Sequence, residues 1–340
     1  MLDQRTVLAM LRAAAEPTRL RILALLMQGA LSVKDLTRIL NQSQPRISRH
    51  LKLLVEAGLV DRFRDGSWAY FQLVEHGDQG RLADALLGVI DPLDAMLERD
   101  RSRAETIKRE RELAAQTYFQ ANASEWDRIR SLYVAENEVE DEVVRAVGEG
   151  PFSLLVDLGT GTGRMLELLA GRYKRAVGFD INNTMLAYAR SKLEHSDIRD
   201  ASVRHGDLYE VALHNGAADA VIMHQVLHFL IEPAQAIQEA ARILAPGGRL
   251  VIIDFAPHSM EFLRDRFAHE RLGISRSQMA VWLSAAGLTL SAARDLVPTA
   301  HGADGKLTVS VWTAVRPALP DTSIAPDAST GGNSRKRVEA

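Results

Sequence analysis

The chain contains no cysteine among its 340 residues. Disulfides, thiolate metal sites, cysteine nucleophiles and thiol redox sensors are therefore excluded. No apolar run approaches the length of about 20 residues that a membrane span requires, and charged residues are scattered through the first thirty positions, which is not the pattern of a signal peptide. We therefore expect a cytoplasmic protein with no membrane contact.

A strong net charge is absent as well, because 41 Lys and Arg face 44 Asp and Glu. The total charge argues neither for nor against a nucleic-acid partner. The distribution is more informative: residues 1–76 hold eleven basic and seven acidic side chains, so the N-terminal part is basic and the remainder acidic. The length and the hydrophobic content of 46% suit two domains.

The first hundred residues show helical periodicity followed by a hairpin signal. Apolar residues recur at helical spacing in four stretches, 2–15, 18–27, 33–40 and 44–56. Apolar-rich arms within 59–73 then flank Asp65-Gly66, a dipeptide typical of a tight hairpin turn. Helices followed by a short hairpin predict a winged helix-turn-helix, whose second motif helix enters the major groove of DNA.

Polar side chains crowd the start and one side of the helix predicted at 44–56. The residues of this helix region predicted to contact DNA are Ser43, Gln44, Arg46, Ser48, Arg49, His50 and Lys52. On the hairpin, Arg62, Arg64 and Ser67 are predicted to meet phosphates.

At three places the sequence resembles the ArsR/SmtB family of bacterial repressors: EPTRLRIL at 16–23, QPRISRHLKLL at 44–54 and AGLV at 57–60. The resemblance implies a homodimer joined by the first helix and by a helix after the wing, at 80–97. It also implies binding to operator DNA that a small effector releases. A winged helix that serves only protein contacts or dimerisation stays open as an alternative.

Metal sensing, which is the best-known function of that family, is not expected here. Residues 31–36, around the start of the third helix, hold no cysteine, and the predicted dimer helix holds no histidine. We therefore predict no metal ligands, and the effector should enter elsewhere.

Residues 94–116 are dominated by Glu, Arg, Asp, Lys and Ala and hold few large apolar residues. This composition predicts a mostly solvated helix. Because such a helix would span from the dimer helix to the next domain, we also consider the hypothesis that it passes a ligand-induced change toward DNA.

In the second half, strand-like apolar runs alternate with helical stretches, which predicts a parallel sheet covered by helices. The first run leads into a glycine loop at 159–163. This loop is not a P-loop, because it lacks Gly-Lys-Ser/Thr. It is not a dinucleotide fingerprint either, because Arg164 stands where the third glycine would be. Asp157 is placed to neutralise an amino group, Asp180 to accept hydrogen bonds from ribose hydroxyls, and Asp207 to receive an adenine amino group. Together these groups indicate S-adenosylmethionine.

This half closely resembles the class I S-adenosylmethionine-dependent methyltransferases, through VDLGTGTGR at 156–164, GFDI at 178–181, HGDL at 205–208, DAVIMHQVLH at 219–228 and APGGRL at 245–250. The resemblance implies an α/β, Rossmann-like fold with a mostly parallel seven-stranded sheet that ends in an antiparallel pair, 288–297 and 307–315, joined through 301–305. It further implies cofactor contacts to methionine from Asp157, Gly159, Gly161 and Gly163, to ribose from Asp180, and to adenine from Asp207, Leu208 and Ile181.

The catalytic residues are harder to predict, because methyl transfer is an in-line displacement that requires few side chains beyond those that position the reactants. His224 and His228, near the end of the fourth strand, are candidates for a base or an acceptor contact, and packing residues are the alternative. An Asn-Pro-Pro-Tyr-type motif for nucleic-acid amino groups is missing, so we predict a small-molecule methyl acceptor. The lack of cysteine argues against arsenite methylation.

The predicted domains are a winged helix at 1–99, a connector at 100–117, a methyltransferase domain at 118–317 and a disordered tail at 318–340. Three functions fit this division. The first is an ArsR-type transcriptional regulator whose second domain methylates a small molecule. The second is a regulator whose methyltransferase fold only senses S-adenosylmethionine or S-adenosylhomocysteine. The third is a methyltransferase that uses its winged helix only to dimerise.

Overall fold

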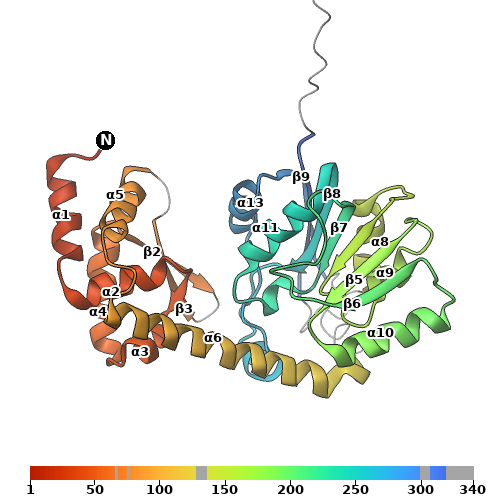
Figure 1. Ribbon diagram of the computed structural model, residues 1–340, viewed down its shortest axis with the longest axis horizontal. Coiled ribbons are helices and arrows are strands. Elements are labelled where there is room, and N and C mark those ends of the chain that lie inside the picture. Colours follow the sequence, from red (N-terminus) through yellow and green to blue (C-terminus); the bar gives the residue numbers. More distant parts are fainter. Residues whose placement is uncertain (66–67, 75–76, 128–135, 299–306, 319–340) are drawn as a thin grey trace, which may run out of the picture.

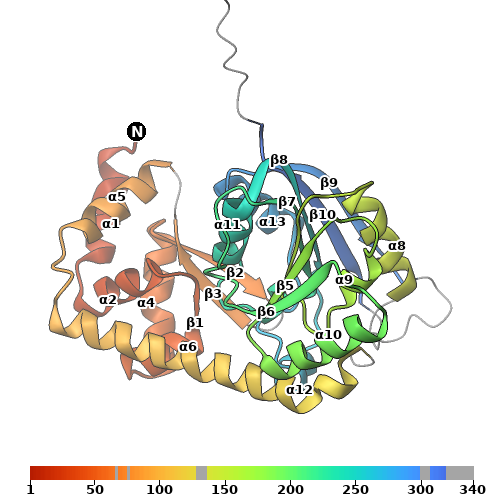
Figure 2. The same ribbon diagram turned by 45° about the vertical axis from the view of Figure 1, so that its right-hand side comes forward.

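Two domains lie side by side and are joined by one long helix (Figure 1). The computed structural model describes residues 1–65, 68–74, 77–127, 136–298 and 307–318. Helix α6 (Ala95–Asn122) runs along the lower edge of both domains in two views (Figures 1 and 2). It therefore contributes to each of them.

Local sequence sets the ends of the N-terminal helices. Helices α1 (Gln4–Ala14) and α3 (Val33–Leu40) follow Asp3 and Ser32, whose side chains accept hydrogen bonds from backbone N–H groups of the first turn. Helices α2 (Pro17–Leu26) and α4 (Gln44–Glu56) carry proline in the first turn, where a missing N–H is tolerated. The four predicted helices are confirmed, with small shifts at the ends of α1 and α2.

The predicted hairpin is confirmed too. Strands β2 (Val60–Asp65) and β3 (Trp68–Leu73) are antiparallel, and β1 (Leu31–Ser32) pairs with the other edge of β3. Phe71 packs in the core together with buried residues of α4, whereas Phe63 stacks on Tyr70 with ring centroids 5.6 Å apart. The turn at 66–67 lies outside the described residues, and so does the predicted phosphate contact Ser67.

The helix expected at 80–97 is present as α5 (Gly77–Gly88), but its expected extension to 97 is wrong, because the chain breaks after Gly88 and begins α6 at Ala95. Pro92 lies in the break, and proline cannot donate the backbone hydrogen bond that a continuous helix needs. Asp94 then caps α6, since its Oδ1 accepts from the N–H groups of Met96 and Leu97 at 2.9 and 3.1 Å. The helix predicted at 94–116 is confirmed, and it continues to Asn122.

The first half of α6 is bound tightly to the winged-helix domain. The carboxylate of Asp100, 1% exposed, accepts hydrogen bonds from Nε and Nη2 of Arg21 in α2 at 2.6 and 2.7 Å. Arg103 donates to the carbonyl oxygen of Ile39 at 3.0 Å, and Ile107 is buried in the same core. A helix with a mostly polar surface is thus anchored by a bidentate ion pair as well as by packing.

The second domain is built on a sheet that has seven strands in the described part of the chain, in the order β6-β5-β4-β7-β8-β10-β9. Its strands are β4 (Leu155–Leu158), β5 (Ala176–Asp180), β6 (Ala201–His205), β7 (Ala218–His224), β8 (Leu244–Phe255), β9 (Thr289–Leu296) and β10 (Val309–Val315). Strands β4 to β8 pair in parallel, and β10 is antiparallel to both β8 and β9. The predicted sheet, with its antiparallel end, is confirmed.

Helices cover both faces of the sheet, which separates two apolar cores (Figure 2). One face packs against α8 (Glu136–Val147), α9 (Arg164–Leu168) and α10 (Asn183–His195). The other packs against α11 (Pro233–Ile243) and α13 (Arg276–Ala285). The short elements are α12 (Phe262–Phe267) and the 3-10 helices η1 (Ala123–Glu125) and η2 (Leu227–Phe229).

Parts of the predictions concern residues that the structure does not describe, namely the loop at 301–305 and positions 319–340 of the tail. The domain boundaries at 99, 117 and 317 stay predictions, and α6 runs without a break across the first two. Among the described helices, none is both long enough and apolar enough to cross a membrane.

The Asp100–Arg21 pair yields a test of how α6 is anchored. Asp100→Ala leaves a largely buried guanidinium without its partner, so we expect the winged-helix domain to lose on the order of 3 kcal/mol. Hydrogen exchange of the buried amides of α2 measures this loss, with the exposed Asp84→Ala in α5 as the matched control. Equal exchange in both variants would show that packing alone anchors α6.

Candidate functional site

The loop after β4 has a backbone that suits glycine. Gly159 and Gly161 have φ of +76° and +52°, in the left-handed region that glycine adopts without strain. A Cβ on Gly159 would lie 2.5 Å from Cγ2 of Val226, which follows β7. The loop therefore approaches the end of the neighbouring strand more closely than a larger residue would permit.

Two carboxylates hold this loop in place. Asp157, at 1% exposed, accepts a hydrogen bond from the Thr160 hydroxyl at 2.7 Å. Asp180, the last residue of β5, accepts from the Gly161 N–H at 2.9 Å through Oδ2 and from the Asn182 N–H at 2.8 Å through Oδ1. Burial raises the pKa of Asp180, and these N–H donors act in the opposite direction.

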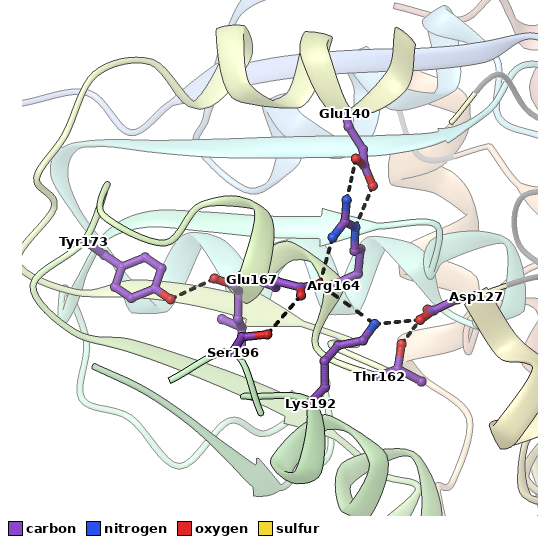
Figure 3. Close-up of polar contacts among 9 residues, drawn as sticks. Asp127, Glu140, Thr162, Arg164, Glu167, Tyr173, Lys192 and Ser196 are labelled. Carbon is purple, nitrogen blue, oxygen red and sulfur yellow. Dashed lines mark hydrogen bonds and ion pairs between the residues drawn. The ribbon is translucent and has the colours of Figure 1, made fainter. Parts of the chain in front are cut away.

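A charged network supports the outer side of the loop (Figure 3). Arg164 donates to both carboxylate oxygens of Glu140 in α8 and to Glu167, each at 2.7 Å. The hydrogen bonds to Glu140 raise the pKa of Arg164 above its usual range. Asp127 accepts from Thr162 of the loop at 2.7 Å and from Lys192 of α10 at 2.6 Å. Arg164, at the position where a dinucleotide fingerprint has glycine, thus joins α9 to α8.

A cavity of about 190 Å³ opens at the carboxyl ends of the parallel strands. The structure brings together there most of the predicted site: Asp157, Gly159, Gly161, Asp180, Ile181, Asp207, Leu208 and His224. Asp207 and Ile181 are exposed, and Leu208 is buried. Gly163 does not line the cavity; it lies at the N-cap of α9, where its φ is +79°.

The two candidate histidines occupy different environments. His224 lines the cavity. His228, 2% exposed, does not line it and instead places Nδ1 2.7 Å from Oδ1 of the fully buried Asp254. Its ring also lies 4.3 Å, between centroids, from that of His269. The geometry of His228 is therefore that of a packed and hydrogen-bonded core residue, and a catalytic role for His224 stays a prediction.

Sequence reasoning did not find the aromatic wall of the cavity. Phe119, Trp126 and Phe229 line it together, with ring centroids 5.2 Å apart for the first two and 4.7 Å apart for Phe119 and Phe229. Nothing in the sequence placed the aromatic residues between 118 and 126 beside Phe229. Glu112, Ala115 and Gln116 of α6 also line the cavity, and no motif marks them.

The predicted DNA-contacting residues form an exposed surface on α4 and the wing. Those exposed to solvent are Ser43, Gln44, Arg46, Ser48, Arg49, Lys52, Arg62 and Arg64. His50 differs, because it is half-buried with Nδ1 3.5 Å from the Glu16 carboxylate. Burial lowers the pKa of His50, and Glu16 opposes that shift. His50 is therefore less exposed than its neighbours for contact with a phosphate.

Comparison with known proteins assigns each half to a family. The profile described as bacterial regulatory protein, arsR family, matches residues 16–62, and the methyltransferase domain profile matches residues 156–252. The arsenic resistance transcriptional regulator ArsR1 of Pseudomonas putida is 40% identical over 94 residues, which are 27% of this chain and 72% of that regulator. The chain belongs to the arsR family of bacterial regulatory proteins and carries a class I methyltransferase fold in its second half.

Other matches cover the second half. Demethylmenaquinone methyltransferase of Clavibacter sepedonicus is 29% identical over 164 residues, 48% of this chain and 65% of that enzyme. This chain covers less than two thirds of the length of three of its relatives, namely 34%, 65% and 40%. A chain in the complex between the Haloferax volcanii Trm112 methyltransferase activator and a methyltransferase has a TM-score of 0.51 and 21% identity, over 61% of this chain and 99% of that one. At this identity the likeness shows the fold alone.

The glycine loop leads to a stability prediction. Gly159→Ala combines a left-handed φ, which costs about 1–2 kcal/mol for other residues, with a clash against Val226 that adds roughly 1–3 kcal/mol. Gly171→Ala is the matched control, because its φ is +86° and nothing lies within 4 Å of the new Cβ. Urea titration followed by circular dichroism should show the larger loss for Gly159→Ala. Equal losses would mean that Val226 moves aside freely.

Proposed function

We propose that this chain is a DNA-binding transcriptional regulator whose methyltransferase domain binds S-adenosylmethionine. The observation that carries the proposal is the convergence of Asp157, Asp180 and Asp207 on one cavity, behind a loop whose glycines leave room for a ligand. The exposed basic face of α4 supports the DNA-binding part.

The residues of the cavity fit an adenosyl sulfonium ligand. The loop at Gly159 and Gly161, with Asp157, would hold the methionine part, because a carboxylate and a close backbone suit an ammonium group. Asp180 would accept from the ribose hydroxyls. Ile181 is 42% exposed, so it offers an apolar surface to adenine, and Asp207 would accept from the adenine amino group beside Leu208.

For the bound cofactor we propose methyl transfer to a small molecule. S-adenosylmethionine supplies an activated methyl group, so the protein has to orient the acceptor and, where needed, remove a proton. His224 lies in the cavity wall and is the proposed proton acceptor or acceptor contact. Phe119, Trp126 and Phe229 form an apolar side that would exclude water and hold an acceptor with apolar surface.

A second candidate function is sensing of S-adenosylmethionine or S-adenosylhomocysteine without catalysis. A specific observation favours it: α6 lines the ligand cavity and also forms ion pairs with α2 and α3 of the winged-helix domain. A ligand in the cavity would therefore touch a helix on which the DNA-reading domain is built. Both functions use operator DNA, and we propose a homodimer through the winged-helix domain for both.

Arg49→Ala tests the DNA part. Arg49 is exposed on α4 and should contact a base edge or a phosphate, so we expect binding to weaken by roughly 1–3 kcal/mol. The probe is a duplex that the full chain enriches from a random-sequence pool, and fluorescence anisotropy measures binding. Arg109→Ala, exposed on α6, is the control. Unchanged specific binding would remove α4 as the reading helix.

Asp180→Ala tests the ligand part. Loss of the acceptor for two ribose hydroxyls, and of its hold on Gly161, should weaken S-adenosylmethionine binding by roughly 1–3 kcal/mol. Isothermal titration calorimetry measures the affinity, and Glu194→Ala on the exposed side of α10 is the control. If Asp180→Ala binds as tightly as the control, the ribose assignment is wrong.

Methyl transfer separates the two functions. The full chain is incubated with methyl-labelled S-adenosylmethionine and a cell metabolite extract, and His224→Asn is compared with wild type. Catalysis predicts labelled product that falls at least about tenfold in the variant while ligand affinity stays. Binding without any labelled product leaves sensing as the function.

A further inference from the structure

One face of α6 belongs to the ligand cavity. Glu112, Ala115, Gln116 and Phe119 line it, at intervals of three and four residues that place them on one side of a helix. The backbone oxygen of Gln116 accepts from Nδ2 of Asn182 at 3.3 Å. Because the Asn182 N–H binds Asp180, α6 is fastened directly beside the predicted ribose site.

Glu112 stands near the predicted adenine end of this cavity. Burial, together with the nearby carboxylates of Glu232 and Glu112, raises the pKa of Tyr209 to about 12. Tyr209 follows Asp207 and Leu208 in the chain and lines the same cavity. Within the described part of the chain, no hydrogen bond or ion pair engages the Glu112 carboxylate. It is thus available to accept from an amino group of a ligand.

The neighbouring residue, Arg111, faces the winged-helix domain. Its Nη2 is hydrogen-bonded to Oδ1 of Asp35 in α3, and its Nη1 lies 3.7 Å from Oε2 of Glu270 in the methyltransferase domain. Burial raises the pKa of Glu270, and Arg111 opposes that shift. Arg111 therefore joins α6 to both domains within a single turn from Glu112.

Asp35 is an integral part of the start of α3. It is 1% exposed, and its Oδ2 accepts from the N–H and the hydroxyl of Ser32 at 3.1 and 2.7 Å. This is the capping box of α3, and Arg111 holds the other oxygen of the same carboxylate. Helix α3 in turn packs on α4, since Leu36 and Ile39 share a core with Ile47 of α4.

We propose that Glu112 and Gln116 are adenosyl-contacting residues supplied by the connector helix, and that Arg111 transmits occupancy of the cavity to the capping box of α3. The inference rests on the proposed function, namely that the cavity takes an adenosyl ligand. It adds that the site is completed by the regulator's own helix. Ligand binding then alters the position of α3 relative to α4, the two helices of the DNA-reading motif.

Calorimetry with S-adenosylhomocysteine tests the contact made by Glu112. We expect Glu112→Ala to raise the Kd about tenfold, because a charged hydrogen-bond acceptor is lost. Glu98→Ala, exposed in the first turn of α6, is the matched control, and alanine keeps α6 helical in both variants. If Asp180→Ala weakens binding of the ligand but the Kd of Glu112→Ala stays within about twofold of the control, the assignment of Glu112 is overturned.

Hydrogen exchange of the full chain tests the transmission. Saturating S-adenosylhomocysteine should change the exchange of the α3 amides, residues 33–40, by about fivefold in wild type and in the control Arg109→Gln. In Arg111→Gln the change should vanish while calorimetry still shows ligand binding. The double variant Asp35→Asn with Arg111→Gln removes both charges of this ion pair together, so that Asp35 is not left as a buried carboxylate without its partner, and it should also give no response.

The outcomes separate this inference from the proposed function. If wild type binds S-adenosylhomocysteine and α3 does not respond, or if the Arg111 variants respond as wild type does, transmission through Arg111 is refuted while the ligand site stands. If wild type shows no binding of S-adenosylhomocysteine or S-adenosylmethionine, the proposed function fails and the inference fails with it.

Discussion

The continuity of α6, which contacts both domains, is the constraint on which the arrangement of the whole chain depends. A polar helix of 28 residues keeps its shape chiefly because tertiary packing supports it. The Asp100–Arg21 pair supports one end, and the hydrogen bond from Asn182 to Gln116 supports the other. Its helical backbone runs without a break from Ala95 to Asn122. One helix therefore contacts both domains, although each has its own core.

The same constraint explains why both the sheet domain and α6 contribute residues to the cavity. Parallel strands bring Asp157, Asp180 and the residues after β6 to one edge of the sheet, as the fold requires. Here α6, with Phe119 in its last turn, and Trp126 after it cover one side of that edge. The covering helix is the one that enters the regulator's core at Ile107. One wall of the cavity is thus built from the helix that also packs in the winged-helix domain.

Most of the fold was predictable because short-range chemistry marks it. Caps such as Ser32, prolines in first turns and the alternation of strands with helices are local signals. The C-terminal bound of the helix expected at 80–97 was wrong, because Pro92 and the capping residue Asp94 divide this segment. His228 resembled His224 in sequence, but the buried carboxylate of Asp254, 26 residues away, gives it a different role.

By itself, the sequence determined the two fold classes, the basic face of α4 and the acidic residues at the strand ends, since each depends on residues close together in the chain. The tertiary structure alone decided which side chains meet across long distances. It set Phe119 against Phe229, and it placed Glu112 in a cavity while Arg111 reached Asp35. Such contacts depend on how two separately folded cores pack on one helix, and helical periodicity does not specify which partner each face meets.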